Sequence, residues 1–154
     1  MPEFSHISDG KASMVDVSQK PDQTREAVAR GTIILQHETI TAIQNGTVIK
    51  GNVLATARIA AVLAVKDTPR IIPMCHAIPV HHISVDFDVT DDRIITSVLV
   101  RSSGKTGVEM EALVGVNIAL LTIWDMVKSA EKDSNGQYPV TKITDVFVVS
   151  KVKI

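Results

Sequence analysis

Alternation of apolar and polar positions marks the strands that this chain is expected to form. The clearest case is residues 82–90, where isoleucine, valine and phenylalanine alternate with serine and aspartate. A period of two places one set of side chains on a buried face and the other set on an open face. Three further segments alternate or are rich in β-branched residues and are predicted as strands: 24–35, 94–101 and 140–149.

A longer spacing of apolar residues predicts helices over 39–44, 50–66 and 107–132. The first of these helices ends at Asn45-Gly46, which is a helix stop signal. The second is rich in alanine and suits a buried helix, and the third is apolar almost all round, as core helices are. Residues 67–79 contain three prolines and are predicted as a loop.

The predicted order of elements is strand, helix, helix, strand, strand, helix, strand. Apart from the short first helix, this is the split βαβ order of a ferredoxin-like α+β fold, with an antiparallel sheet and helices on one face. Residues 1–22 are polar and are predicted as a flexible N-terminal arm with an extended apolar patch at 14–17. Residues 23–154 are predicted as a single catalytic α+β domain. The other face of its sheet needs a second cover, which makes self-association plausible.

Composition limits the classes of function. The chain has 154 residues, of which 45% are apolar and only 3% aromatic, and its net charge is −1. A neutral chain with few rings for base stacking is not expected to bind nucleic acid. One cysteine permits neither an internal disulfide nor a cysteine-rich metal site. The histidines at 76, 81 and 82 match no zinc spacing, so no metal ligand is predicted.

The location of the protein is also predicted from simple patterns. The first residues, M-P-E-F-S-H-I, do not have the basic and then apolar order of a signal peptide. No apolar run approaches the roughly 20 residues that are needed to cross a bilayer. We therefore expect a cytoplasmic protein without a membrane partner.

Charged residues stand at both ends of the long apolar helix. Glu109 and Glu111 are at its start, and Asp125 and Lys128 are at its end. A helix rises about 1.5 Å per residue, so Glu109 and Asp125 are separated by roughly 24 Å. One small substrate could hardly touch both ends of one copy. If both ends carry chemistry, either the helix is broken or two subunits share the site.

Each of these charges has a structural alternative. Thr106 and Glu109 have the spacing of a capping box, which would explain Glu109 without a site. Capping does not explain Glu111. Asp125 and Lys128 are three residues apart and can form an ordinary intrahelical ion pair. In a partly dry cleft, the same two side chains can form a proton-transfer pair, since burial lowers the pKa of a lysine and a nearby carboxylate raises it.

Other candidates lie in loops. His76 is either a hydrogen-bonding or proton-relaying group or an inert loop residue, and Cys75 is either a small buried hydrophobe or a nucleophile. Lys50 lies beside Gly51 before a helix, where it is either solvated or able to reach an anion. The run Gly104-Lys105-Thr106 looks like the end of a P-loop, but that motif requires glycine where this chain has Leu99.

Six segments of the chain are distinctive when they are taken together. They are M-V-D-V-S at 14–18, T-R-E-A at 24–27, K-G-N-V-L-A-T-A-R-I-A at 50–60, I-P-M-C-H at 72–76, G-K-T-G-V-E-M-E-A-L at 104–113 and L-T-I-W-D-M-V-K at 121–128. In this order they resemble the molybdenum cofactor biosynthesis protein C family, the cyclic pyranopterin monophosphate synthases, and the resemblance covers about residues 5–135.

The resemblance implies an enzyme, a phosphorus–oxygen lyase. Its reaction converts 3′,8-cyclo-7,8-dihydroguanosine 5′-triphosphate to cyclic pyranopterin monophosphate and releases diphosphate. The family implies a ferredoxin-like protomer in a hexamer, a trimer of dimers, with sites at the dimer interface. Asp125 and Lys128 match its catalytic pair. The positions that match its substrate pocket are Met74, Cys75, His76, Met110, Glu111, Lys50 and Glu109.

The chemistry of that reaction suits these side chains. Opening a ring and closing a cyclic phosphate need proton donors and acceptors, with cations on the triphosphate. Lys50, Lys105 and Arg25 are candidates for holding phosphates, and no cofactor is expected beyond Mg²⁺ with the triphosphate. The chain departs from the family at Ala77, where many members have proline, and in its last residues, V-F-V-V-S-K-V-K-I, which replace a tail rich in glycine, serine and lysine.

Two other classes of function remain open from the residues alone. The same fold can serve as a regulatory module that binds a nucleotide or an amino acid without turnover. It can also be a structural subunit of an oligomer. Both alternatives predict that replacing Lys128 by alanine leaves assembly intact and changes little else.

Overall fold

A four-stranded antiparallel sheet organises the chain, which we describe from a computed structural model for residue 2 and residues 7–154. The strands lie side by side in the order β4-β5-β3-β6. All neighbouring pairs are antiparallel, and β3 is central because it pairs with both β5 and β6. The strands are β3 (Gln23–Ile34), β4 (Val80–Val89), β5 (Arg93–Gly104) and β6 (Lys142–Lys153).

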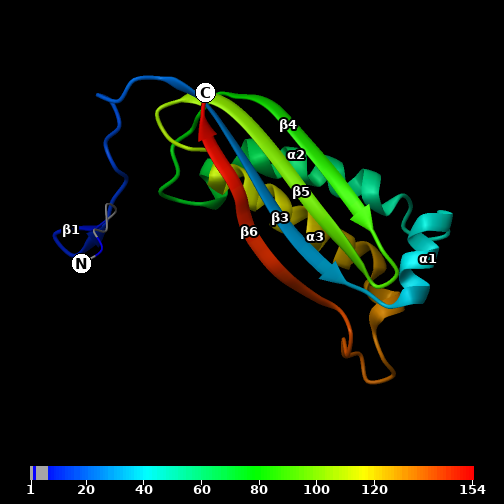
Figure 1. The fold of residues 1–154 in the computed structure, drawn as a ribbon. Helices are drawn as coiled ribbons and strands as arrows, with labels where there is room; N and C mark the ends of the chain where they lie inside the picture. Colours follow the sequence, from blue (N-terminus) through cyan, green and yellow to red (C-terminus); the bar gives the residue numbers. More distant parts are fainter. Residues whose placement is uncertain (1, 3–6) are drawn as a thin grey trace.

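Helices cover one face of this sheet. Figure 1 shows α2 and α3 running behind the strands, with α1 at the end of the sheet where β3 leaves it. The order of elements and the order of strands are those of the split βαβ arrangement, so the prediction of a ferredoxin-like α+β fold is confirmed. The helices are α1 (His37–Asn45), α2 (Val53–Ile71) and α3 (Glu109–Glu131).

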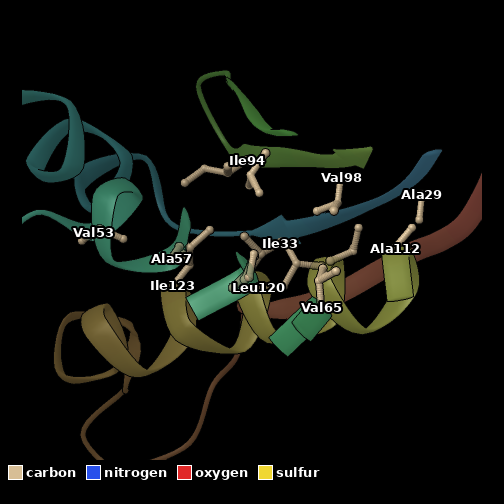
Figure 2. Close-up of a cluster of buried hydrophobic side chains, with 14 of the residues drawn as sticks. Ala29, Ile33, Val53, Ala57, Val65, Ile94, Val98, Ala112, Leu120 and Ile123 are labelled. Carbon is tan, nitrogen blue, oxygen red and sulfur yellow. The ribbon is translucent and has the colours of Figure 1, made fainter. Parts of the chain in front are cut away.

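The core lies between the helices and the sheet. In Figure 2, Ile33 and Val98 of the strands point toward Leu120 of α3 and Val65 of α2. Aliphatic side chains fill this layer, as the low aromatic content requires. β3 approaches α3 so closely at Gly31 that a Cβ atom there would lie 2.7 Å from Val116 Cγ1, so glycine is needed at this position.

The second helix is longer than predicted. It begins after Asn52, whose side chain accepts a hydrogen bond from the amide of Ala55 at 2.9 Å, and it continues through Pro69 to Ile71. The predicted loop at 67–79 was therefore wrong in its first part. Pro69 stands in the last turn, where a missing N–H removes only one hydrogen bond. The amide of Ile72 still donates to Thr68 O at 2.8 Å, which closes that turn.

Two strands also extend beyond their predicted ends. β5 reaches Gly104, which pairs with Gln23, and β6 reaches Lys153, which pairs with Arg25. The predicted strand ends at 101 and 149 were too early because the central strand β3 supplies hydrogen-bonding partners over its whole length. The chain's last residues are thus part of the sheet, and they place Lys151 beside the start of α3.

The N-terminal arm contains a small hairpin that the sequence analysis did not identify. Its two strands are β1 (Ile7–Ser8) and β2 (Lys11–Ala12), joined by Asp9 and Gly10 with positive φ angles of 52° and 74°. Residues 1 and 3–6 of the predicted arm lie outside the described residues. In Figure 1 the hairpin stands apart from the sheet, and the chain returns from it to the start of β3.

The helix α3 is long and apolar enough to cross a membrane by length and composition, contrary to the expectation that no apolar run approaches that length. Its position explains its composition. More than half of its most apolar window, 56%, is buried inside the protein, against the sheet and α2. Core helices of soluble proteins pass the same test, so α3 is weak support for a membrane segment.

Candidate active site

One cavity gathers most of the predicted site residues. It has a volume of about 310 Å³ and lies between the start of α3, the loop before β4 and the N-terminal arm. The sequence brings these parts together because the start of α3 follows the end of β5, while residues 72–79 lead directly into β4 beside it. We call this cavity the Glu111 pocket. Six of the predicted site residues line it: Met74, Cys75, His76, Glu109, Met110 and Glu111.

Glu111 is the most unusual group in this pocket. Its side chain is only 3% exposed, and its Oε2 atom is buried without a hydrogen-bond partner among the described residues. Burial raises the pKa of this carboxyl, and the charge of Glu109 raises it further, although a hydrogen bond from its own amide lowers it. A buried, unpaired carboxyl is costly for folding, so it suits a group that exchanges protons or binds a polar ligand.

Glu109 has a different environment two residues away. Its Oε1 atom accepts a hydrogen bond from Lys151 Nζ at 3.0 Å. Burial acts to raise the pKa of Glu109, but hydrogen bonds from its own amide and from Lys151, with the charges of Lys151 and Arg25, lower it overall. The capping-box alternative is wrong, because the helix begins after Val108 and has no side-chain cap from Thr106.

The loop before β4 contributes His76 and Cys75. His76 Nε2 lies 2.6 Å from the carbonyl oxygen of Val15, and since a carbonyl only accepts, this nitrogen carries the proton. His76 is therefore not inert but holds the arm. The free thiol of Cys75 is half-buried, and burial followed by the charges of Glu111 and Glu109 raises its pKa. This environment disfavours a thiolate nucleophile.

The three remaining predicted residues form a second cluster at the far end of α3. Lys128 Nζ lies 2.9 Å from Asp125 Oδ1, and Lys50 Nζ lies 3.3 Å from Asp125 Oδ2 and 2.9 Å from the Asp125 carbonyl oxygen. Lys50 reaches this helix end from the loop between α1 and α2. We call these three residues the Asp125 cluster.

The Asp125 cluster is open to solvent in the single chain. The side chains of Asp125 and Lys128 are 60% and 44% exposed, so the expected partly dry cleft is not formed by one copy alone. Hydrogen bonds from Lys128 and then Lys50 lower the pKa of Asp125. The hydrogen bond to Asp125 raises the pKa of Lys128. Both groups are therefore charged at neutral pH in the single chain, and neither is tuned toward neutrality.

The two charged regions are far apart in one chain. α3 is continuous from Glu109 to Glu131, so the possibility of a broken helix is removed. The fourteen steps from Glu111 to Asp125 correspond to about 21 Å along the helix axis. A small ligand therefore cannot contact both the Glu111 pocket and the Asp125 cluster of the same chain.

Two predicted phosphate-binding cations have structural partners. Arg25 donates to the carbonyl oxygens of Gly104 at 3.2 Å and Lys105 at 3.3 Å, and Lys105 Nζ donates to the carbonyl oxygen of Ser18 at 3.1 Å. These bonds hold the loop before α3 and the arm against it. Among the residues that the structure describes, no group of three or more histidine, cysteine, aspartate or glutamate side chains is placed to hold a metal ion.

A buried carboxylate near the Asp125 cluster escaped the sequence analysis. Glu131, in the last turn of α3, is 0% exposed and accepts hydrogen bonds from the amide of Gln36 at 3.1 Å and the hydroxyl of Thr141 at 2.7 Å. The hydroxyl of Thr39 also donates to it. Glu131 therefore joins α3 to the start of α1 and to the approach to β6. The sequence did offer a signal for this residue, since Glu131 is an acid three residues after Lys128 in an otherwise apolar helix.

These features define a ferredoxin-like α+β protein with an acidic pocket at one end of its core helix and a lysine–aspartate cluster at the other. The same segments that carry these residues also carry the resemblance noted in the sequence. The profile of the MoaC family matches residues 14–153, and the chain belongs to that family.

Curated relatives are similar over their whole length. A protein of Methanospirillum hungatei, named "Probable cyclic pyranopterin monophosphate synthase", is 67% identical over 153 residues, which is 99% of this chain and 98% of the relative. A protein of Methanoregula boonei with the same name is 67% identical over 153 residues, 99% of each chain. In Methanothermobacter thermautotrophicus, a relative 54% identical over 154 residues, 100% of this chain and 97% of the relative, is named "Probable cyclic pyranopterin monophosphate synthase accessory protein".

Proposed function

We propose that this protein is a cyclic pyranopterin monophosphate synthase of molybdenum cofactor biosynthesis. It converts 3′,8-cyclo-7,8-dihydroguanosine 5′-triphosphate to cyclic pyranopterin monophosphate and diphosphate. Full-length similarity to proteins of that name supports the activity. The observation that carries the proposal is the Glu111 pocket, which brings six matched residues of two distant segments to one cavity.

The Asp125 cluster supplies proton transfer and positive charge in this proposal. Lys128 is protonated in the single chain, and because Asp125 raises its pKa, it is suited there to stabilise phosphate charge while it keeps its proton. To accept a proton, Lys128 must lose water, and coverage by a second copy would provide that dry environment. Lys50 contacts Asp125 from the other side and is assigned to the triphosphate.

The Glu111 pocket is assigned to the guanine-derived ring. Ring conversion needs groups that can give and take protons at ring nitrogens, and the raised pKa of Glu111 brings that carboxyl toward neutrality. His76, whose Nε2–H is donated to the carbonyl oxygen of Val15, lies at the rim of the pocket, and Met74 and Met110 offer adaptable apolar walls. Diphosphate leaves when a ribose oxygen forms the cyclic phosphate, so we propose the class of phosphorus–oxygen lyases.

We propose that the active site is completed by a neighbouring copy, as a hexamer built from three dimers would allow. The continuous helix α3 separates the two charged regions by about 21 Å in one chain, more than one small substrate spans. Exposed apolar side chains on the helices and on β6 support association, since such surface is usually covered. They include Ile59, Leu63, Leu121, Phe147 and Val149.

The proposal also includes the surroundings of the enzyme. The protein is expected to work in the cytoplasm, where nucleoside triphosphates are available, with no nucleic-acid partner and no membrane partner. No bound cofactor is assigned, and Mg²⁺ is expected only as a companion of the substrate triphosphate, which it commonly is for such groups.

Turnover of the cyclo-dihydro-GTP intermediate tests this function directly. The protein is incubated with the intermediate, and diphosphate and pterin products are measured for the natural chain and for Lys128→Ala. Lys66→Ala is the matched control, because Lys66 is an exposed lysine on α2 that does not belong to the Asp125 cluster. Loss of product only in Lys128→Ala, with unchanged thermal unfolding, supports the enzyme. A regulatory module or a structural subunit would give no product with any of the three chains.

A further inference from the structure

Residues 13–18 of the N-terminal arm form an extended segment along the Glu111 pocket. Between residues 13 and 18 the exposure alternates, with Val15 and Val17 half-buried and Met14 and Asp16 exposed. A period of two is the signature of an extended chain that turns one face to the protein. Both half-buried valines line the Glu111 pocket, and among the described residues of the arm only Lys20 lines it with them.

Two side chains from the protein body hold the arm in this position. His76 Nε2 donates to the carbonyl oxygen of Val15 at 2.6 Å, and Lys105 Nζ donates to the carbonyl oxygen of Ser18 at 3.1 Å. The donors belong to the two loops that flank the pocket, before β4 and before α3. Within the arm, the amide of Ser18 donates to Asp16 Oδ1 at 2.9 Å, which shapes the local turn.

The two valines do not serve the hydrophobic core. Neither belongs to the cluster of buried side chains or to the partly buried side chains packed against it. Their apolar surface instead lines the same cavity as the buried carboxyl of Glu111. Binding pockets combine apolar walls with a few polar groups in this way to hold a flat heterocycle and fix its orientation.

We propose that Val15 and Val17 are substrate-contact residues, which form the arm-side wall of the Glu111 pocket and orient the ring of the substrate against Glu111. The identity of that substrate rests on the proposed function. The hydrogen bonds from His76 and Lys105 then have a second purpose, because they hold this wall at a fixed distance from the acid. The arm excludes water from one side of Glu111, where proton transfer takes place.

Steady-state kinetics of the full chain with the cyclo-dihydro-GTP intermediate tests the assignment. In the double variant Val15→Ala and Val17→Ala, we expect KM to rise about tenfold or more, because each methyl lost from an apolar pocket weakens binding severalfold. The midpoint of thermal unfolding should stay the same, since the valines lie outside the core. Met14→Ala is the matched control on the same arm, 53% exposed, and should leave KM unchanged.

Labelling of Cys75 gives a second readout that needs no turnover. This thiol is the single cysteine of the chain and lines the same pocket, so the rate of its modification by iodoacetamide reports cover by the arm. The double variant should react several times faster than the natural chain, and protection by GTP should require a higher concentration.

The two readouts separate this inference from the proposed function. If the natural chain forms no product, the function fails, while faster labelling and weaker GTP protection in the double variant still support contact with the arm. An unchanged labelling rate together with unchanged GTP protection would overturn the inference. A fall in unfolding temperature that accounts for the altered KM would also overturn it, since the valines would then be structural.

Discussion

Replacing Glu111 by glutamine should stabilise the protein at pH 8 and have little effect near pH 4. The ordinary pKa of this carboxyl is 4.5, and burial raises it in the folded chain. The folded state therefore binds the proton more tightly than the unfolded chain. Tighter proton binding stabilises the folded natural chain below pH 4.5, and this stabilisation is lost as the pH rises through the raised pKa of Glu111. Glutamine cannot ionise, so the variant avoids that loss.

The size of the effect follows from the surroundings of the carboxyl. Each unit by which the pKa is raised corresponds to about 1.4 kcal/mol of lost stability at high pH. An ionised acceptor that is buried without a partner, such as Glu111 Oε2, costs more than the neutral amide of glutamine in the same place, and we take about 1–3 kcal/mol for this difference. We therefore expect the free energy of unfolding to increase by about 1–3 kcal/mol at pH 8, which corresponds to about 3–9 °C in unfolding midpoint.

Thermal unfolding followed by circular dichroism measures this difference at pH 4, 6 and 8, at fixed ionic strength and protein concentration. Glu38→Gln is the control, because Glu38 is an exposed glutamate in the first turn of α1. Its removal should slightly destabilise the helix through the lost interaction with the helix dipole. A Glu111→Gln chain that is less stable than the natural one at pH 8, or that differs equally at pH 4 and pH 8, would refute the reasoning.

The same variant connects stability with function. A buried carboxyl that weakens the fold is retained only when it serves another purpose, so Glu111→Gln should gain stability and lose turnover of the cyclo-dihydro-GTP intermediate. Stability gained without loss of turnover would separate Glu111 from the chemistry.

Three further variants test other parts of the account. Glu131→Ala should destabilise the chain by about 3–5 kcal/mol in urea unfolding, because buried donors lose a charged acceptor; Glu131→Gln should cost clearly less, and equal costs would contradict the hydrogen-bonding role. Gly31→Ala should cost about 1–3 kcal/mol, because the added methyl would crowd α3, whereas the control Gly104→Ala meets only ordinary contacts. Lys50→Met should reduce turnover at least tenfold without changing the unfolding midpoint by more than about 2 °C, since exposed ion pairs add little stability; a large loss of stability would assign Lys50 to the fold.

Much of the fold could be predicted because one face of the sheet is buried. The alternation over residues 82–90 reports the two faces of β4 directly, and its pairing with β5 follows from the turn at Asp91-Asp92. Element ends were less predictable, since they depend on partners elsewhere. Pro69 favours a loop, yet α2 continues past this proline as far as Ile71, because the preceding turns of the helix are already formed. The ends of β5 and β6 are set by the length of their partner β3, and the sequences of β5 and β6 alone do not contain that information.

The residues of the candidate site could be predicted from the sequence, but the degree to which each of them is buried could not. α3 is apolar nearly all round, and this pattern predicts cover on every side. In the single chain, Leu121 is 52% exposed and Asp125 is 60% exposed, because the sheet and α2 cover only part of the helix. The apolar positions round α3 thus include a surface that remains exposed in a single copy of the chain. Glu131 was missed because its partners Gln36 and Thr39 lie more than ninety residues away in sequence.

Complementation between two inactive chains tests the central claim most directly, which is that the Glu111 pocket of one copy works with the Asp125 cluster of another. Chains with Asp125→Ala and Glu111→Ala are each inactive, and they are unfolded together, mixed equally and refolded. In a mixed dimer one of the two sites receives both natural residues. With random pairing, about a quarter of the natural activity should return. Activity no higher than that of either variant alone, in mixtures shown by mass to contain mixed dimers, would contradict a site shared between copies.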